Sequence, residues 1–255
     1  LKITFLGTGT SSGVPMIACP CPVCHSSDTK DKRLRSSILV ESATTRLVVD
    51  TTPDFRCQML RANVTKLNAV LFTHPHKDHI AGLDDIRAYN YFSGKPMDIY
   101  ANEMTQEVVI RELPYAFTDF HYPGVPEIRL NTIATDPFMV GDIEVVPIQV
   151  WHLKMPVLGF RFGNFTYITD ANRVDEPERK KIRGSKVIVV NVLRKEKHIS
   201  HFNLEEAVEF LQDLQIPQAY FTHISHQLGK HADLEKELPR GMQQAYDGLV
   251  IKVDS

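Results

Sequence analysis

Short apolar runs alternate along the chain with stretches in which apolar residues recur every three to four positions. Continuous or alternating apolar runs are typical of strands, whereas the second spacing places apolar side chains on one face of a helix. The predicted strands are residues 3–6, 37–41, 46–50, 69–73, 98–101, 143–149, 158–162, 166–169, 187–192, 219–222 and 250–253. The predicted helices are residues 54–62, 83–92, 105–111, 175–181 and 204–214.

Many short strands with interspersed helices favour a layered α/β architecture in which some hairpins replace crossovers. The helix at 204–214 has a clear start, because Asn203 is a good N-cap and Glu206 completes a capping box. No low-complexity segment or obvious linker divides the chain, and the Pro-rich, aromatic stretch 114–137 is interpreted as a long excursion. We therefore predict one domain over residues 1–255.

Composition and charge narrow the possible partners. Hydrophobic residues make up 43% and charged residues 24%, as in an ordinary globular protein, and the formal net charge is −2. This charge gives no general attraction to nucleic acid or to an anionic membrane, so a polyanionic substrate requires local positive charge. No apolar run approaches the ~18–20 residues of a membrane span, and the first one, residues 1–6, is too short for a signal peptide. We expect a cytoplasmic protein without a membrane partner.

The strongest candidate chemistry follows the apolar run 69–73. It is the segment His74-Pro-His76-Lys-Asp78-His79, which holds three imidazoles and one carboxylate within six residues. His74 and His76 are two apart, so an extended backbone points both to one side, and a turn into a helix could bring Asp78 and His79 to a second point nearby. This mixed set suits zinc, manganese or iron. The alternatives are a polar surface loop or a single structural metal; the recurrence of candidate ligands downstream favours a two-metal site.

Those downstream candidates share one pattern, an apolar strand with a ligand type at its C-terminal end. They are His152, Asp170 and His223. Two ions sharing seven ligands require a bridging group, and Asp170 is the natural one, because a carboxylate has two oxygens whereas imidazole has one free nitrogen. Asp50 ends a strand in the same way, and we expect it to orient a ligand histidine from outside the metal shell.

A second cluster lies near the start of the chain. Cys19, Cys21 and Cys24 supply three sulfurs, too close in sequence for an ordinary disulfide framework, and tetrahedral zinc takes a fourth ligand. Cys57 is one option, but it falls in a helix start and can simply be a core residue. His226 is the better fourth ligand, since it lies three residues beyond His223 and would connect a structural zinc to the rim of the catalytic site. The alternative is redox-active or merely buried thiols.

The His-x-His-x-Asp-His motif, with later histidines and an aspartate at strand ends, resembles the metallo-β-lactamase fold superfamily over nearly the whole chain. The resemblance implies an αβ/βα sandwich of two mixed β-sheets flanked by helices, with two divalent metal ions, zinc or manganese, at one edge. It assigns His74, His76 and His152 to one metal and Asp78, His79 and His223 to the other, with Asp170 as the bridge. Many reactions occur on this fold, so it does not name the substrate.

The Cys-x-Cys-x-x-Cys segment after the Gly-rich loop of residues 7–15 narrows the resemblance to PhnP-like phosphodiesterases, and parts of the loop also resemble ribonuclease Z. The simplest interpretation of the loop is a tight turn after the first strand. Alternatively, its amides and the hydroxyls of Ser11 and Ser12 could line a phosphate pocket. In these enzymes a histidine outside the metal shell stabilises the transition state or protonates the leaving oxygen. By its place before Asn203 and the helix, His201 matches this residue better than His198. A helix-capping or surface histidine is the alternative.

These residues predict two-metal hydrolysis of a small phosphodiester, and the PhnP resemblance suggests a cyclic ribosyl phosphate. In this scheme Asp78 orients or deprotonates the nucleophilic water, whose pKa the metals lower, and His201 protonates the leaving alkoxide. Arg56 and Arg87 are candidate phosphate contacts or ordinary surface arginines. The family commonly forms homodimers. Three other functions remain open: transfer-RNA processing, against which the net charge speaks; thiolester or β-lactam hydrolysis; and a PqqB-like, non-hydrolytic role in cofactor maturation.

Overall fold

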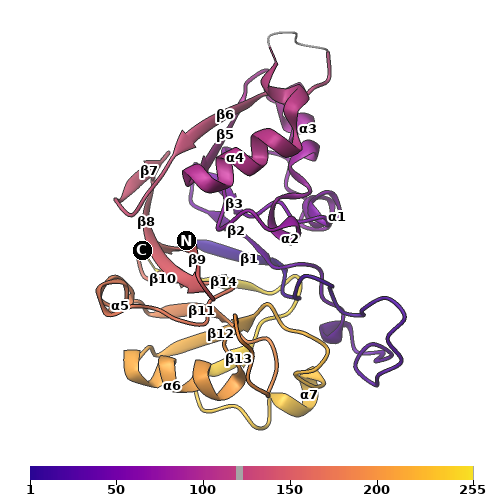
Figure 1. Ribbon diagram of the computed structural model, residues 1–255, viewed down its shortest axis with the longest axis vertical. Helices are drawn as coiled ribbons and strands as arrows, with labels where there is room; N and C mark the ends of the chain where they lie inside the picture. The colour runs from indigo at the N-terminus through magenta and orange to yellow at the C-terminus, as the bar shows by residue number, and fades with distance from the viewer. Residues whose placement is uncertain (119–122, 255) are drawn as a thin grey trace.

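Two seven-stranded β-sheets face each other, and helices cover the outer face of each sheet (Figure 1). The computed structural model describes residues 1–118 and 123–254. The two ends of the chain lie close together, where the amino group of Leu1 donates a hydrogen bond of 2.6 Å to the carbonyl oxygen of Val253. This is the α/β sandwich with two mixed sheets that the sequence predicts.

The first sheet has the strand order β14-β1-β2-β3-β4-β5-β6. Its pairs from β14 to β3 are antiparallel and those from β3 to β6 are parallel. Its strands are β1 (Lys2–Gly7), β2 (Ser37–Glu41), β3 (Arg46–Val49), β4 (Ala69–Leu71), β5 (Met97–Ala101), β6 (Ile128–Thr132) and β14 (Val250–Lys252).

The second sheet has the order β13-β12-β11-β10-β9-β8-β7. It joins antiparallel pairs from β7 to β10 to parallel pairs from β10 to β13. Its strands are β7 (Phe138–Val140), β8 (Ile143–His152), β9 (Met155–Phe162), β10 (Phe165–Tyr167), β11 (Val187–Asn191), β12 (Gln218–Thr222) and β13 (Met242–Gln244).

Apolar side chains form three layers, one between the sheets and one under each set of helices. The central layer includes Phe5, Phe160 and Tyr167, all fully buried. The helices over the first sheet are α1 (Phe55–Arg61), α2 (Lys77–Ile80), α3 (Arg87–Ser93) and α4 (Glu103–Glu112). Those over the second sheet are α5 (Glu176–Ile182), α6 (Leu204–Leu214) and α7 (His231–Leu234). Both faces of each sheet are therefore buried, which explains why the inner strands are continuous apolar runs.

Each predicted strand and helix overlaps an element of the structure, and the capping box of α6 at Asn203 and Glu206 is present. The sequence did not predict β6, β7 and β13, nor the short helices α2 and α7. The stretch 114–137, interpreted from the sequence as a long excursion, contains β6 and a short 3₁₀ helix that the sequence did not predict. Residues 119–122 of this stretch lie outside the described residues.

None of the helices in the described chain is long and apolar enough to cross a membrane.

Candidate metal centre

The segment from His74 to His79 leaves the end of β4 and enters the short helix α2. His76 is the N-cap of this helix and has an extended backbone, with φ −65° and ψ 148°. Nε2 of His74 and Nδ1 of His76 are 3.0 Å apart. Asp78 and His79 lie in the first turn of α2, so the turn directs them to a second point, as the spacing predicts.

The remaining predicted ligands come from the second sheet, each at or just beyond the C-terminal end of a strand. His152 is the last residue of β8, Asp170 follows β10 and His223 follows β12 directly. Asp170 and His223 have φ of 56° and 54°, in the left-handed region that few side chains adopt. Such conformations cost about 1–3 kcal/mol each and tend to occur at functional sites, where the turn redirects a side chain. Here they accompany the arrival of both side chains at one cluster.

Four side chains converge on one point: Asp78, His79, Asp170 and His223. Nε2 of His79 lies 3.2 Å from an oxygen of Asp78 and 3.2 Å from Oδ2 of Asp170, which is also 3.2 Å from Nδ1 of His223. Both histidine nitrogens are buried and, among the described residues, neither has a hydrogen-bond partner. Buried polar atoms are ordinarily paired, and unpaired nitrogens facing carboxylates fit a divalent cation between them.

The other predicted ligands, His74, His76 and His152, lie close to one another and to the first group, since the ring centres of His74 and His79 are 4.2 Å apart. The ring of His76 is 4.6 Å from that of His74 and 5.2 Å from that of His152, between ring centres. Asp170 also belongs to a second group of candidate ligands, with His152 and His201. Asp170 is therefore common to both groups, as expected of the carboxylate that the sequence predicts to bridge.

Asp50 occupies the position expected of an orienting residue. It is fully buried, and its Oδ2 accepts a hydrogen bond of 2.7 Å from Nδ1 of His79. Thr73 holds the same carboxylate through its amide and its hydroxyl, each at 2.9 Å. This contact leaves Nε2 of His79 directed at the cluster, in the manner of a carboxylate–histidine–metal arrangement. Thr73 was not singled out from the sequence, although its place immediately before His74 was a signal.

Burial and charge set the protonation of the cluster. Burial lowers the pKa of His74 well below its ordinary value and that of His223 to about 4, so both present a lone pair at neutral pH. Burial opposes the ionisation of Asp170, but His223, His79 and a hydrogen bond from His201 hold its pKa well below the usual range. Burial likewise opposes protonation of His79, but Asp170, Asp78 and Asp50 raise its pKa well above the ordinary value.

His201 reaches the same cluster from the loop between β11 and α6. Its Nε2 lies 3.0 Å from Oδ1 of Asp170, and the residue is 9% exposed. The resemblance placed this histidine outside the metal shell; in the structure it contacts the bridging candidate itself. The surface or helix-capping alternative does not hold, because Asn203 caps α6. One partner that the sequence did not signal is the carbonyl oxygen of Ser200, which accepts a hydrogen bond of 2.9 Å from Nδ1 of His152.

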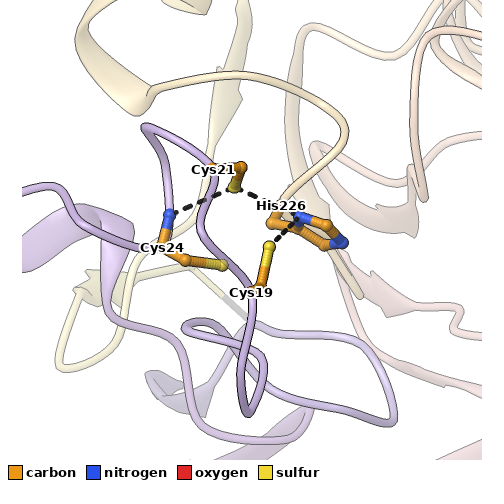
Figure 2. Close-up of side chains that lie close together, drawn as sticks. All are labelled: Cys19, Cys21, Cys24 and His226. Atoms are coloured by element: carbon orange, nitrogen blue, oxygen red, sulfur yellow. Dashed lines mark hydrogen bonds between the residues drawn. The ribbon is translucent and has the colours of Figure 1, made fainter.

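The second candidate metal site combines the N-terminal loop with the segment after β12 (Figure 2). Nδ1 of His226 is 3.4 Å from the sulfur of Cys19 and 3.3 Å from that of Cys21. Tetrahedral zinc with bonds of about 2.3 Å to sulfur and 2.0 Å to nitrogen requires S···N distances of about 3.5 Å. Cys24 completes the group, and all the cysteines are free thiols. These residues fit one zinc ion.

The thiols of this second site differ in acidity. The amide of Cys24, which donates to the sulfur of Cys21, lowers the pKa of Cys21 to about 6. Burial raises the pKa of Cys24 to about 11. Cys57 is absent from the cluster; it lies exposed on α1, so its interpretation as a core residue was wrong.

The remaining residues that the sequence suggested as substrate contacts lie outside the two candidate metal sites. Arg56 faces a groove of about 570 Å³ between α1 and α3, and Arg87 pairs with Asp84 at 3.1 Å. The Gly-rich loop packs against the segment after β12, because the amide of Thr10 donates to the carbonyl oxygen of Ile224 and the amide of Ile224 donates to that of Thr8. Ser11 and Ser12 are exposed on this loop.

Comparison with known proteins agrees with this fold. Residues 45–224 match the family model of the Beta-lactamase superfamily domain, and the chain belongs to this superfamily and has the metallo-β-lactamase fold. The crystal structure of a diphosphatase from the PhnP family has 35% sequence identity and a TM-score of 0.93, covering 99% of this chain and 98% of that one. This confirms the resemblance to the PhnP-like branch.

Among curated relatives, the octanoyltransferase of Porphyromonas gingivalis is 35% identical over 257 residues, which is 100% of this chain and 52% of that protein. The chain thus spans about half the length of this relative. The coenzyme PQQ synthesis protein B of Methylorubrum extorquens is 24% identical and covers 98% of the chain and 99% of its own length. A ribonuclease Z of Nostoc is 28% identical over 166 residues, covering 63% of this chain and 46% of its own length.

Proposed function

We propose that this chain is a metal-dependent phosphodiesterase that hydrolyses a small phosphodiester. The observation that carries the proposal is the contact of His201 with Asp170 inside a complete donor set. Metal binding accounts for the histidines and carboxylates of the cluster, whereas a buried histidine beside the bridging carboxylate supplies a proton donor. The likeness to a diphosphatase of the PhnP family, which also breaks a P–O bond, supports the choice of substrate class.

We expect these residues to hold two divalent ions, zinc or manganese, and His74, His76 and His152 would be the donors to one. Asp78, His79 and His223 would be the donors to the other, and Asp170 would be shared. Ions held there would supply Lewis acidity, lowering the pKa of a water molecule and neutralising charge on the phosphoryl oxygens. The Cys19, Cys21, Cys24 and His226 group would hold one structural zinc.

The side chains of the protein have separate roles in the proposed reaction. Asp78 is ionised, because His79 lowers its pKa below the usual range despite burial, so it can orient the attacking water or accept its proton. Oxygen of the water bonds to phosphorus as the bond to the leaving oxygen breaks. His201 gives the proton on its Nε2 to that leaving oxygen, which departs as an alcohol. Asp50 and Thr73 keep His79 in place throughout.

A panel of cyclic and linear phosphodiesters, including a cyclic ribosyl phosphate, tests this proposal on protein whose metal content has been measured. We expect hydrolysis of at least one member at neutral pH. Lack of turnover on every phosphodiester, with both metals bound, would overturn it.

A thiolester is the second candidate substrate. It is favoured by the octanoyltransferase relative, which matches the whole of this chain. Because the match covers only about half of that protein, an octanoyl thiolester ranks below a phosphodiester. The same panel should include one: faster turnover of the octanoyl thiolester than of any phosphodiester would reverse the order. A non-hydrolytic role like that of a cofactor-maturation protein predicts turnover of neither. In all cases the partner is a small molecule, and a nucleic-acid substrate is disfavoured by the net charge of −2.

A further inference from the structure

Both ring nitrogens of His201 face hydrogen-bond partners, and only one of these partners belongs to the metal centre. Nε2 faces Oδ1 of Asp170 at 3.0 Å. Nδ1, on the opposite side of the ring, lies 3.1 Å from Oγ of Ser200 and 3.2 Å from Nδ1 of His198. As a proton donor, the ring carries hydrogen on both nitrogens, and after transfer from Nε2 it is left neutral with hydrogen on Nδ1. The Nδ1 hydrogen therefore needs an acceptor before and after the transfer.

The hydrogen bonds around Nδ1 of His201 can all form together, with each donor facing an acceptor. Nδ1–H of His201 donates to Oγ of Ser200, whose own hydrogen points to Nδ1 of His198, 3.3 Å away. The amide of Ser200 donates to the same nitrogen of His198 at 3.4 Å. His198 must then be neutral with a lone pair on Nδ1, and burial, together with His201 and Arg194, lowers its pKa accordingly.

The loop that carries these residues is held from several sides. Asn172 donates a hydrogen bond of 2.9 Å to the carbonyl oxygen of Ile199, and Arg194 donates one of 2.9 Å to that of Lys197. Ser200 is buried, and its own carbonyl oxygen accepts from His152. Ser200 thus contacts a candidate metal ligand through its backbone and His201 through its side chain, so these two contacts can be separated by mutation.

We propose that Ser200, backed by His198, is a positioning residue for His201. Its hydroxyl accepts the Nδ1 hydrogen and fixes the ring with Nε2 facing Oδ1 of Asp170 in the metal centre, from where Nε2 can donate to the leaving oxygen. The inference rests on the proposed function for the destination of the proton, which passes from Nε2 to the leaving oxygen as the P–O bond breaks. It adds to that function two residues that touch neither metal nor substrate.

The Ser200→Ala variant tests the proposal, because it removes the hydroxyl and keeps the carbonyl oxygen that binds His152. On a phosphodiester with an alkyl leaving group, which needs a proton, we expect kcat to fall about tenfold or more. KM and metal content should stay unchanged. On a phosphodiester whose leaving group is p-nitrophenolate, which leaves without a proton, kcat should fall at most about twofold. Ser200→Thr keeps a hydroxyl and should restore kcat, and Lys197→Ala on the same loop is the control. His198→Ala should give a smaller loss of the same kind.

A second readout does not depend on activity. In ¹⁵N-histidine spectra of the metal-free protein, the His201 signals, assigned by their loss in His201→Ala, should shift in Ser200→Ala and return in Ser200→Thr. Equal losses on both leaving groups, or unshifted His201 signals, would overturn the positioning role. If the wild type cleaves no phosphodiester, the proposed function fails, and the spectra alone decide this inference.

Discussion

Each residue of the candidate metal centre meets two requirements. Its side chain must point in a precise direction, and its protonation state must suit a nearby cation. Asp50, Asp170 and His223 meet the first through left-handed backbone turns at strand ends. Burial and neighbouring charge meet the second, leaving His74 and His223 unprotonated and Asp170 ionised. Such a site lowers the free energy of unfolding when the cation is absent, because strained turns and buried carboxylates are both unfavourable without it.

Replacement of His201 by Ala removes the proposed proton donor. We expect turnover of a phosphodiester with an alkyl leaving group to fall by about 10²–10⁴, the usual contribution of general acid catalysis. Metal content, measured by atomic emission, should stay that of the wild type, and Lys154→Ala on the exposed β8–β9 turn serves as the control. Unchanged turnover would remove His201 from the mechanism.

The acid sensitivity of the metal-free protein should depend on His223. Its folded pKa is about 4, whereas the unfolded chain has the ordinary value of about 6.5. As the pH falls between these values, the unfolded chain binds a proton that the folded chain does not. The stability that neutral His223 contributes is present above pH 6.5 and is lost progressively toward pH 4. In urea titrations across this range, the free energy of unfolding should fall more steeply for the wild type than for His223→Gln; parallel curves would contradict the assignment.

At the scale of elements, the sequence predicts the inner strands well because each is buried on both faces. It misses β6, β7 and β13, which lie at sheet edges and bury less of their length. The candidate ligands were predictable because each is a ligand type placed after an apolar strand. The contact of Ser200 with His152 was not, because it uses a backbone carbonyl, which every residue has.

Close packing between the loop after β3 and α2 should make Gly82 sensitive to substitution. A Cβ at this position would lie 2.1 Å from the carbonyl oxygen of Thr52 and 2.7 Å from Cβ of Phe55. Gly82→Ala should therefore lower the free energy of unfolding by about 1–3 kcal/mol, as overpacking does, and displace α2 with Asp78 and His79. Ala81→Ser, at the exposed neighbouring position, should leave stability within about 0.5 kcal/mol of the wild type. A stable Gly82→Ala protein with full metal content would show that α2 is not held in this way.

The cysteine group should bind one zinc ion independently of the histidine centre. Cys21→Ser removes a ligand whose pKa of about 6 makes it a ready thiolate, so we expect one zinc ion fewer per chain and a lower melting temperature. Cys57→Ser is the matched control, because this thiol is exposed and outside the group. Equal zinc content in the two variants would contradict the structural site.

In the whole molecule, both candidate metal sites draw on segments that are distant in sequence. The histidine centre joins the ends of strands from both sheets. The cysteine group ties the N-terminal loop to the residues after His223 (Figure 2). Ordering of this loop by zinc would therefore support the rim of the active site. The alternation of strands and helices predicted a layered α/β architecture, whereas its division into two mixed sheets followed from the family resemblance. The recurrence of ligand types at the ends of separate strands was visible in the sequence itself.

The most direct test of the account is a titration with manganese or zinc of protein that keeps the zinc ion of the cysteine group but holds no other metal, while the hydrolysis of bis(p-nitrophenyl) phosphate is followed. Activity should rise until two further ions are bound per chain. Asp170→Asn, which weakens the shared ligand, should prevent that rise. Saturation of the histidine centre by two ions without cleavage of any phosphodiester would contradict the account.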